Sequence, residues 1–196
     1  MMKKRVKIIA GNAIRKKHNL NNMGQYYKPI NLENGQWLYS HDYDNGLKLM
    51  EHSWIGNQFV GAVMKLMLPG GRWYKKPIVW CGDYYNEEGE EDYYDRVADD
   101  KKIRLQESLS AKEQLDAILV NHTTKEYVVY TKMPDADGWR INPLPLLTAL
   151  GNGRGGGDYY DDLPDSDKVG IWAKHILSIE FEIPDGYTEL KVVFKE

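Results

Sequence analysis

The chain has 196 residues and a formal net charge of −3, with 42% hydrophobic and 28% charged residues. This length and composition suit one globular domain, residues 1–196, and exclude disorder over most of the chain. Because the net charge is slightly negative, we expect neither general electrostatic attraction to nucleic acid nor attraction to anionic lipid.

The cellular compartment is indicated by the single cysteine and by the lack of long apolar runs. Cys81 cannot form a disulfide within the chain, and no charged-then-apolar leader opens the sequence. The longest apolar stretch, residues 59–68, is interrupted by Gly61 and Lys65, whereas a membrane-spanning helix needs roughly 20 apolar residues. We therefore expect a cytoplasmic protein that does not cross a membrane.

Two segments have a strong charge bias. Residues 1–22 begin with a run that contains basic but no acidic residues up to position 17, and residues 5–10 within it could form a strand. Residues 86–100 form an acidic loop in which Arg96 is the only basic residue. A solvated tail and a solvated loop explain these segments, and the alternative is that the acidic loop is a nucleic-acid mimic or a protein-docking surface.

In the first half of the chain, the pattern predicts a hairpin, a helical region and a buried strand. Residues 26–30 and 36–40 read as two strands around Asn34-Gly35, a dipeptide that favours a tight turn. Apolar residues then recur at helical spacing over residues 46–68, with a possible restart near Gly56. Residues 77–85 follow as a buried strand.

In the second half, residues 115–121 and 126–132 are predicted to form a second hairpin. A short helix is expected over residues 143–150, because proline is tolerated in its first turn and Gly151 can end it. Residues 175–183 and 189–195 alternate apolar and polar on either side of a Pro-Asp-Gly turn, which predicts a terminal hairpin.

The two halves share short matches that suggest an internal duplication, with repeat halves at residues 24–86 and 114–183. The matched pairs recur in the same order: Ile30-Asn31 with Val120-Asn121, Gly56-Asn57 with Gly151-Asn152, and Gly71-x-Trp73 with Gly170-x-Trp172. Chance matching is the competing explanation. The predicted fold class is α+β: a mostly antiparallel sheet with a few helices on one face, built from a duplicated hairpin–helix–strand unit.

Four short segments of the sequence carry a resemblance to a protein family. They are residues 23–27 (MGQYY), 52–57 (HSWIGN), 79–84 (VWCGDY) and 147–159 (LTALGNGRGGGDY). Together they resemble an uncharacterised domain family of bacteria and their viruses, over about residues 23–182. The resemblance brings no activity and no catalytic residue with it. It implies that the glycine-rich segment is a feature of the family.

The glycine-rich run is the main candidate for a ligand site. Successive glycines let backbone amides converge on an anion, and Arg154 could add a bidentate phosphate donor. A dinucleotide-binding fingerprint fails here because a helix, not a strand, precedes the loop, and no Walker lysine follows. The candidate ligand-binding residues are Asn152, Gly153, Arg154, Gly155, Gly156, Gly157, Asp158 and Tyr159. A connector with Gly151 as helix cap is the alternative.

A second group of candidate ligand residues comes from the first half: His52, Trp54 and Asn57. The imidazole and the indole could sandwich a planar ring, with Tyr159 as a further aromatic wall, whereas core packing is the alternative for Trp54. Residues 41–44 (HDYD) could bind a metal, but a tight turn is the simpler explanation. No metal and no cofactor are predicted.

Catalytic chemistry has weak support in the sequence. Cys81 ends an apolar strand without a histidine close in sequence, so we interpret it as a buried structural residue. Asp83 and Asp158, each followed by two tyrosines, could act as a carboxylate pair in a hydrolase or transferase that also uses a histidine.

We therefore expect non-catalytic binding of an anionic, nucleotide-like small ligand, by which the protein could sequester a nucleotide signal. The alternative from a different class is a protein–protein interaction module or inhibitor that acts through an acidic, tyrosine-rich surface. The enzyme with an Asp/His site is the third possibility. Oligomeric state is not indicated by the sequence.

Overall fold

The structure is a computed structural model that describes residues 23–85 and 93–195. The predicted strand at residues 5–10 and the first part of the acidic loop, residues 86–92, lie outside these ranges. The rest of that loop forms the short helix α3 (Tyr93–Arg96) and a 3₁₀ turn at Asp99–Lys101.

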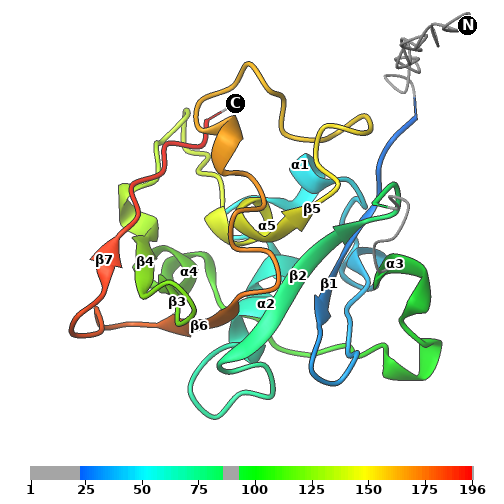
Figure 1. Cartoon of the computed structure of the whole chain (residues 1–196), viewed down its shortest axis with the longest axis horizontal. Coiled ribbons are helices and arrows are strands. Elements are labelled where there is room, and N and C mark those ends of the chain that lie inside the picture. The colour runs from blue at the N-terminus through cyan, green and yellow to red at the C-terminus, as the bar shows by residue number, and fades with distance from the viewer. Residues whose placement is uncertain (1–22, 86–92, 196) are drawn as a thin grey trace, which may run out of the picture.

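Seven strands within the described residues form one open, mostly antiparallel sheet (Figure 1). They are β1 (Tyr27–Asn31), β2 (Lys76–Gly82), β3 (Ile118–Asn121), β4 (Glu126–Val129), β5 (Ala149–Leu150), β6 (Ile176–Glu180) and β7 (Thr188–Glu189). The order across the sheet is β1-β2-β6-β3-β4-β7, and β5 pairs with β2. Only β2–β5 and β4–β7 are parallel. The α+β class with a mostly antiparallel sheet is therefore confirmed.

The remaining helices are short, and α2, α4 and α5 begin at side-chain caps. They are α1 (Leu49–His52), α2 (Gln58–Leu66), α4 (Ala111–Asp116) and α5 (Pro143–Thr148). Asn57 caps α2 by accepting from the Val60 amide, and Asn142 caps α5 by accepting from the Leu144 amide. Such caps satisfy amide groups that have no partner inside the helix. None of the helices in the described ranges is long and apolar enough to cross a membrane.

Four predicted elements differ from the structure. The strand predicted over residues 115–121 begins only at Ile118, because residues 111–116 form α4. The helix predicted over residues 46–68 is divided into α1 and α2, because Gly56 takes a φ of +96° that no helix contains. Residues 36–40 do not form a strand: Trp37 makes isolated bridges to Ile30 and to Lys102. The prediction of a terminal hairpin is wrong, because β6 pairs with β2 and β3, whereas β7 pairs in parallel with β4.

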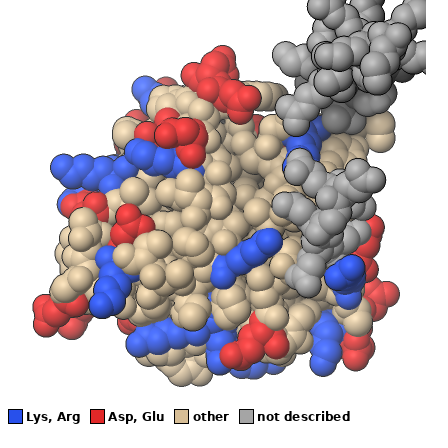
Figure 2. All heavy atoms as spheres, in the orientation of Figure 1, with Lys and Arg blue, Asp and Glu red and all other residues tan. Residues whose placement is uncertain are grey.

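Charged side chains do not gather into one large patch of a single sign on the face shown in Figure 2. Lysines, arginines and acidic residues alternate around that face, with uncharged atoms between them. The described residues on this face therefore present no single-sign surface of the kind that nucleic-acid-binding proteins use.

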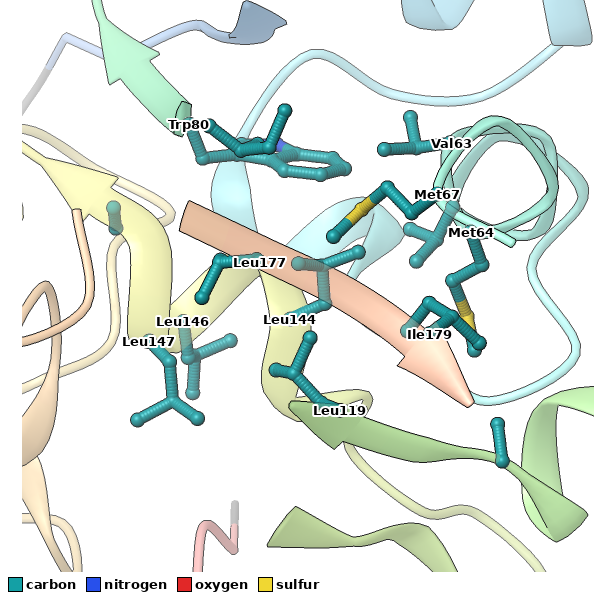
Figure 3. Close-up of a cluster of buried hydrophobic side chains, with 14 of the residues drawn as sticks. Val63, Met64, Met67, Trp80, Leu119, Leu144, Leu146, Leu147, Leu177 and Ile179 are labelled. Atoms are coloured by element: carbon teal, nitrogen blue, oxygen red, sulfur yellow. The ribbon is translucent and has the colours of Figure 1, made fainter. Parts of the chain in front are cut away.

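The main core lies between α2, α5 and one face of the sheet (Figure 3). Met64 and Met67 from the α2 region face Leu177 and Ile179 of β6, and Trp80 of β2 closes the cluster. Successive β2 residues alternate between the two faces, so Val79 and Cys81 belong to a second, smaller cluster with Ile30 and Trp37.

The proposed duplication is not shown by the structure and stays a prediction. Trp73 and Trp172 are alike in being fully buried, each just ahead of a central strand. However, the matched asparagines lie in different places, because Asn57 precedes α2 whereas Asn152 follows α5.

Candidate functional site

The glycine-rich loop surrounds a carboxylate of its own chain. The amides of Gly153, Arg154 and Gly155 donate to Asp158 Oδ2 at 2.7, 2.9 and 3.1 Å. The amides therefore converge as the glycine pattern predicts, but the oxygen that they bind belongs to Asp158. An external anion could use these donors only after displacing a carboxylate that is 2% exposed.

Asp158 is also tied to the first strand. The hydroxyl of Tyr27, in β1, donates to Asp158 Oδ1 at 2.9 Å, so both carboxylate oxygens are hydrogen-bonded. Burial raises the pKa of Asp158, while the hydrogen bonds from the amides and from Tyr27 act in the opposite direction. Such a group stabilises the loop and is not available to an anionic ligand, which it would repel.

The glycines allow other chain segments to approach the loop closely. A Cβ added to Gly155 would lie 2.6 Å from the Cβ of Gln25, and one added to Gly157 would overlap the Lys48 side chain. Gly156 exchanges backbone hydrogen bonds with the same segment, donating to Met23 O and accepting from the Gln25 amide. Close packing against residues 23–25 and Lys48 thus explains these glycines without a ligand.

The other predicted loop residues make internal contacts. Both polar atoms of the Asn152 side chain bind the backbone of Tyr159, at 2.9 Å each. Tyr159 is fully buried and its hydroxyl bonds to Pro164 O and Lys195 O, so the expectation of Tyr159 as an aromatic wall is not met. The Arg154 guanidinium donates to Tyr84 O at 3.0 Å and lies 5.3 Å from the Tyr85 ring.

His52 is a buried structural residue. Its Nε2 accepts from the Trp80 indole at 2.9 Å, which places the ring proton on Nδ1, 3.1 Å from Gly46 O. Burial lowers the pKa of His52 to about 4, so the ring is neutral near pH 7. His52 therefore cannot face a ligand, and Asn57, whose side chain caps α2 and contacts Asn45 Oδ1, is likewise occupied.

Trp54 is the predicted residue that does line a hollow. Its ring meets Trp139 edge to face with centroids 5.6 Å apart. A hollow of about 240 Å³ opens beside the two indoles and is also lined by Pro134, Ile141 and Phe194, with Lys195 at its edge.

Two further hollows are lined by residues that are next in sequence to those of the first. One, of about 270 Å³, lies beside Ile55, Leu115 and Gly138, next in sequence to Trp54 and Trp139. The other, of about 370 Å³, runs between β4 and the C-terminal segment and continues from Met133 and Val193. We refer to these three hollows together with Trp139 as the Trp139 face. In Figure 1 the C-terminal segment, in red, passes beside the yellow-green chain that carries this face.

The segment that carries Trp139 is braced, although the Trp139 side chain is 62% exposed. Ala136 and Trp139 exchange backbone hydrogen bonds, and the Gly138 amide donates to Asp135 Oδ1 at 2.7 Å. Arg140 pairs with Asp135 at 3.0 Å and donates to Met133 O at 2.6 Å. The indole is therefore presented to solvent on a fixed support.

Sequence reasoning missed Trp139, Phe194 and Lys195. The only local signal was the string Asp135-Ala-Asp-Gly-Trp139, a turn sequence that ends in an aromatic residue.

The remaining candidates for catalysis or metal binding do not come together in one site. Cys81 is fully buried, and both oxygens of Asp158 are already bonded, which leaves Asp83 without a free carboxylate partner there. Residues 41–44 form part of a 3₁₀ turn that ends at Asp44 with a φ of +55°. Within residues 23–85 and 93–195, no group of three or more His, Cys, Asp or Glu could hold a metal ion.

Comparison with protein-family models, with curated proteins and with solved structures finds no match for this chain. The function must therefore be argued from the geometry of the chain itself.

Proposed function

We propose that the protein is a recognition module that binds an extended, acidic segment of a partner protein on the Trp139 face. The observation that carries this proposal is an exposed tryptophan on a braced support, which lines one apolar hollow while its neighbours Gly138 and Arg140 line another. Tryptophan is enriched among residues that dominate binding energy at interfaces, and a fixed support lowers the entropy lost on binding.

The sizes of the hollows favour a protein segment over a small molecule. Pockets for small ligands begin at about 300 Å³ and enclose most of the ligand. Two of the three hollows are smaller, at about 240 and 270 Å³. A series of shallow hollows suits successive side chains of one extended segment, in which each side chain fills one hollow.

The charges beside the hollows favour an acidic partner. Lys132 is paired with Glu189, and Lys112 with Asp116. Lys191 and Lys195, in contrast, form no ion pair within the part of the chain that the structure describes. Carboxylates on the partner would complement these two ammonium groups and speed association.

This proposal moves the expected interaction surface from the acidic, tyrosine-rich region to the Trp139 face. It also ranks above the anionic small ligand, because the amides of the glycine-rich loop already bind Asp158.

The test is a selection of displayed random peptides on the wild-type protein, followed by affinity measurements on single-site variants. Selected peptides should combine apolar and acidic residues. They should bind Trp139→Ala at least about 30-fold more weakly, as expected for a central tryptophan worth about 2 kcal/mol. Tyr160→Ala is the matched control, because Tyr160 is also highly exposed but does not line the Trp139 face.

Two results would contradict the proposal. One is equal affinity of the selected peptides for the Trp139→Ala and Tyr160→Ala variants. The other is a nucleotide that raises the melting temperature of the wild type but not of Arg154→Ala, which would assign ligand binding to the glycine-rich loop instead.

A further inference from the structure

A fourth hollow, of about 480 Å³, differs from those of the Trp139 face in its polar lining. It lies between the turn that follows β3, strand β6 and the segment that leads to β7. Polar and charged side chains line it, including Tyr74, Lys75, His122, Glu180, Asp185 and Tyr187. It shares no lining residue with the three hollows of the Trp139 face.

A continuous chain of hydrogen bonds runs along this hollow into the protein. The Tyr187 hydroxyl lies 2.9 Å from His122 Nδ1, and His122 Nε2 lies 2.8 Å from Ser178 Oγ. Ser178 Oγ donates to Glu180 Oε1 at 2.7 Å. The serine is fully buried, whereas Tyr187 and His122 both line the hollow.

The donor and acceptor of each hydrogen bond in this series follow from the last one, between Ser178 and Glu180. Because Ser178 uses its only proton on Glu180, its oxygen can only accept from His122, which places the ring proton on Nε2. The Nδ1 atom of a neutral ring then carries a lone pair and must accept from the Tyr187 hydroxyl. His122 Nδ1 is therefore positioned to accept the proton of the Tyr187 hydroxyl.

The electrostatic surroundings of His122 favour its neutral form, which can act as a base. Burial, and then the nearby Lys75 ammonium, lower the pKa of His122, so the ring is neutral at pH 7. The turn itself does not require histidine. The buried Asn31 forms an equivalent turn, with its side chain accepting from the amide two residues ahead, and there the next residue is Leu32.

We propose that Tyr187 is a catalytic nucleophile for acyl transfer, with His122 as its general base and Lys75 as the charge that stabilises the oxyanion. This activity goes beyond the proposed binding function, and it also departs from the non-catalytic role that the sequence predicts. The arrangement corresponds to a catalytic triad of nucleophile, histidine and acid. Here Tyr187 is the nucleophile and Glu180 is the acid, which Ser178 links to His122.

The reaction has two steps. Tyr187 Oη attacks the carbonyl carbon of the acyl donor, its proton passes to His122 Nδ1, and the bond to the leaving group breaks as that proton is delivered to the leaving group. Water then attacks the acyl-tyrosine, gives its proton to His122, and the phenolate leaves and takes the proton back. The sum is acyl donor plus water to carboxylic acid plus the protonated leaving group.

The chemistry of the intermediate limits the substrate class. An acyl-tyrosine is an aryl ester, so its formation from an ordinary alkyl ester is unfavourable. The donor must be activated to a similar degree, as thioesters and aryl esters are. Because Glu182 and Asp185 also line the hollow, we expect an uncharged or cationic acyl group.

The test uses 4-nitrophenyl acetate, an uncharged aryl ester, and locates acetylated tyrosines in the full-length protein by peptide mass spectrometry. In the wild type, Tyr187 should acetylate at least about 100-fold faster than Tyr160, which is more exposed, since general-base assistance contributes at least this factor. His122→Gln and Glu180→Gln should slow acetylation of Tyr187 and leave that of Tyr160 unchanged. Tyr187→Phe should abolish turnover of 4-nitrophenyl acetate and leave only the stoichiometric release of 4-nitrophenolate that accompanies acetylation of other side chains, with the folded state checked by circular dichroism.

The comparison within the wild type does not depend on whether any variant folds. Equal acetylation rates of Tyr187 and Tyr160 would overturn the proposal. So would unchanged 4-nitrophenolate release in a folded Tyr187→Phe variant, because direct attack by a histidine would then explain the reaction.

Discussion

The Tyr27 hydroxyl donates to Asp158 Oδ1 at 2.9 Å and so joins strand β1 to a loop 131 positions further along the chain. The other carboxylate oxygen accepts from the amides of Gly153, Arg154 and Gly155. The glycine-rich loop is therefore folded around an internal anion, and its geometry depends on that one side chain.

Replacing this anion should destabilise the protein. In Asp158→Asn, the amide group cannot accept all four hydrogen bonds, and at least one buried donor loses its partner. We expect the free energy of unfolding to fall by about 2 kcal/mol, the usual cost of such a donor, measured by urea denaturation. Asp161→Asn, at an exposed position of the same loop, is the control and should change stability little. Equal stability of the two variants would show that the amides do not depend on Asp158.

The neighbouring glycines Gly155 and Gly156 provide a test of why the loop is rich in glycine. Neither has a positive φ, so alanine is compatible with both backbones. A Cβ at Gly155 would lie 2.6 Å from Gln25 Cβ, whereas at Gly156 the nearest atom is 3.5 Å away. Gly155→Ala should therefore cost about 2 kcal/mol of overpacking and Gly156→Ala much less. Similar thermal unfolding of the two variants would contradict close packing as the reason for the glycine at 155.

His52 makes stability depend on pH. Its pKa is about 4 in the folded protein because of burial, against 6.5 when the ring is exposed. Between these values the unfolded chain binds more protons, so the free energy of unfolding should fall as the pH decreases from about 6.5 to about 4. The full contribution is about 3 kcal/mol, present above pH 6.5 and lost as the pH approaches 4.

The control for this prediction is His52→Gln. Glutamine can accept from the Trp80 indole and donate to Gly46 O, but it does not titrate. The wild type should lose more stability than the variant on acidification, although the half-buried His122 and His175 contribute equally to both proteins. Parallel curves of unfolding free energy against pH would show that His52 is not the group responsible.

The sequence predicts elements whose signals are local. The β3–β4 hairpin and the buried strand β2 overlap the ranges that the pattern gives, although residues 115–116 belong to α4 and residues 130–132 form a 3₁₀ turn. Alternation and turn residues act within a few positions, so such elements can be predicted locally. The prediction of a terminal hairpin failed because alternation shows which face of a strand is buried but not which strand lies beside it. Residues 188–189 pair with β4 instead, in parallel.

The candidate sites show the same limit. A glycine pattern indicates that amides converge, but the identity of the anion depends on the three-dimensional path of the chain, which brings Asp158 into the loop. Likewise, the Tyr187–His122–Ser178–Glu180 chain joins residues from separate segments. No spacing rule in one sequence could have revealed it.

The support of Trp139 yields the last prediction. Arg140→Met removes the ion pair to Asp135 and the hydrogen bond to Met133 O while keeping much of the aliphatic volume. Loss of about 1 kcal/mol of local stability should speed amide hydrogen exchange at Trp139 about fivefold, with the amides of β3 unchanged. Lys112→Met is the control, because it breaks the exposed pair with Asp116 on the same side of the molecule without touching the support. If exchange at Trp139 responds equally to both variants, Arg140 does not hold the indole in place, and the case for a pre-arranged binding face weakens with it.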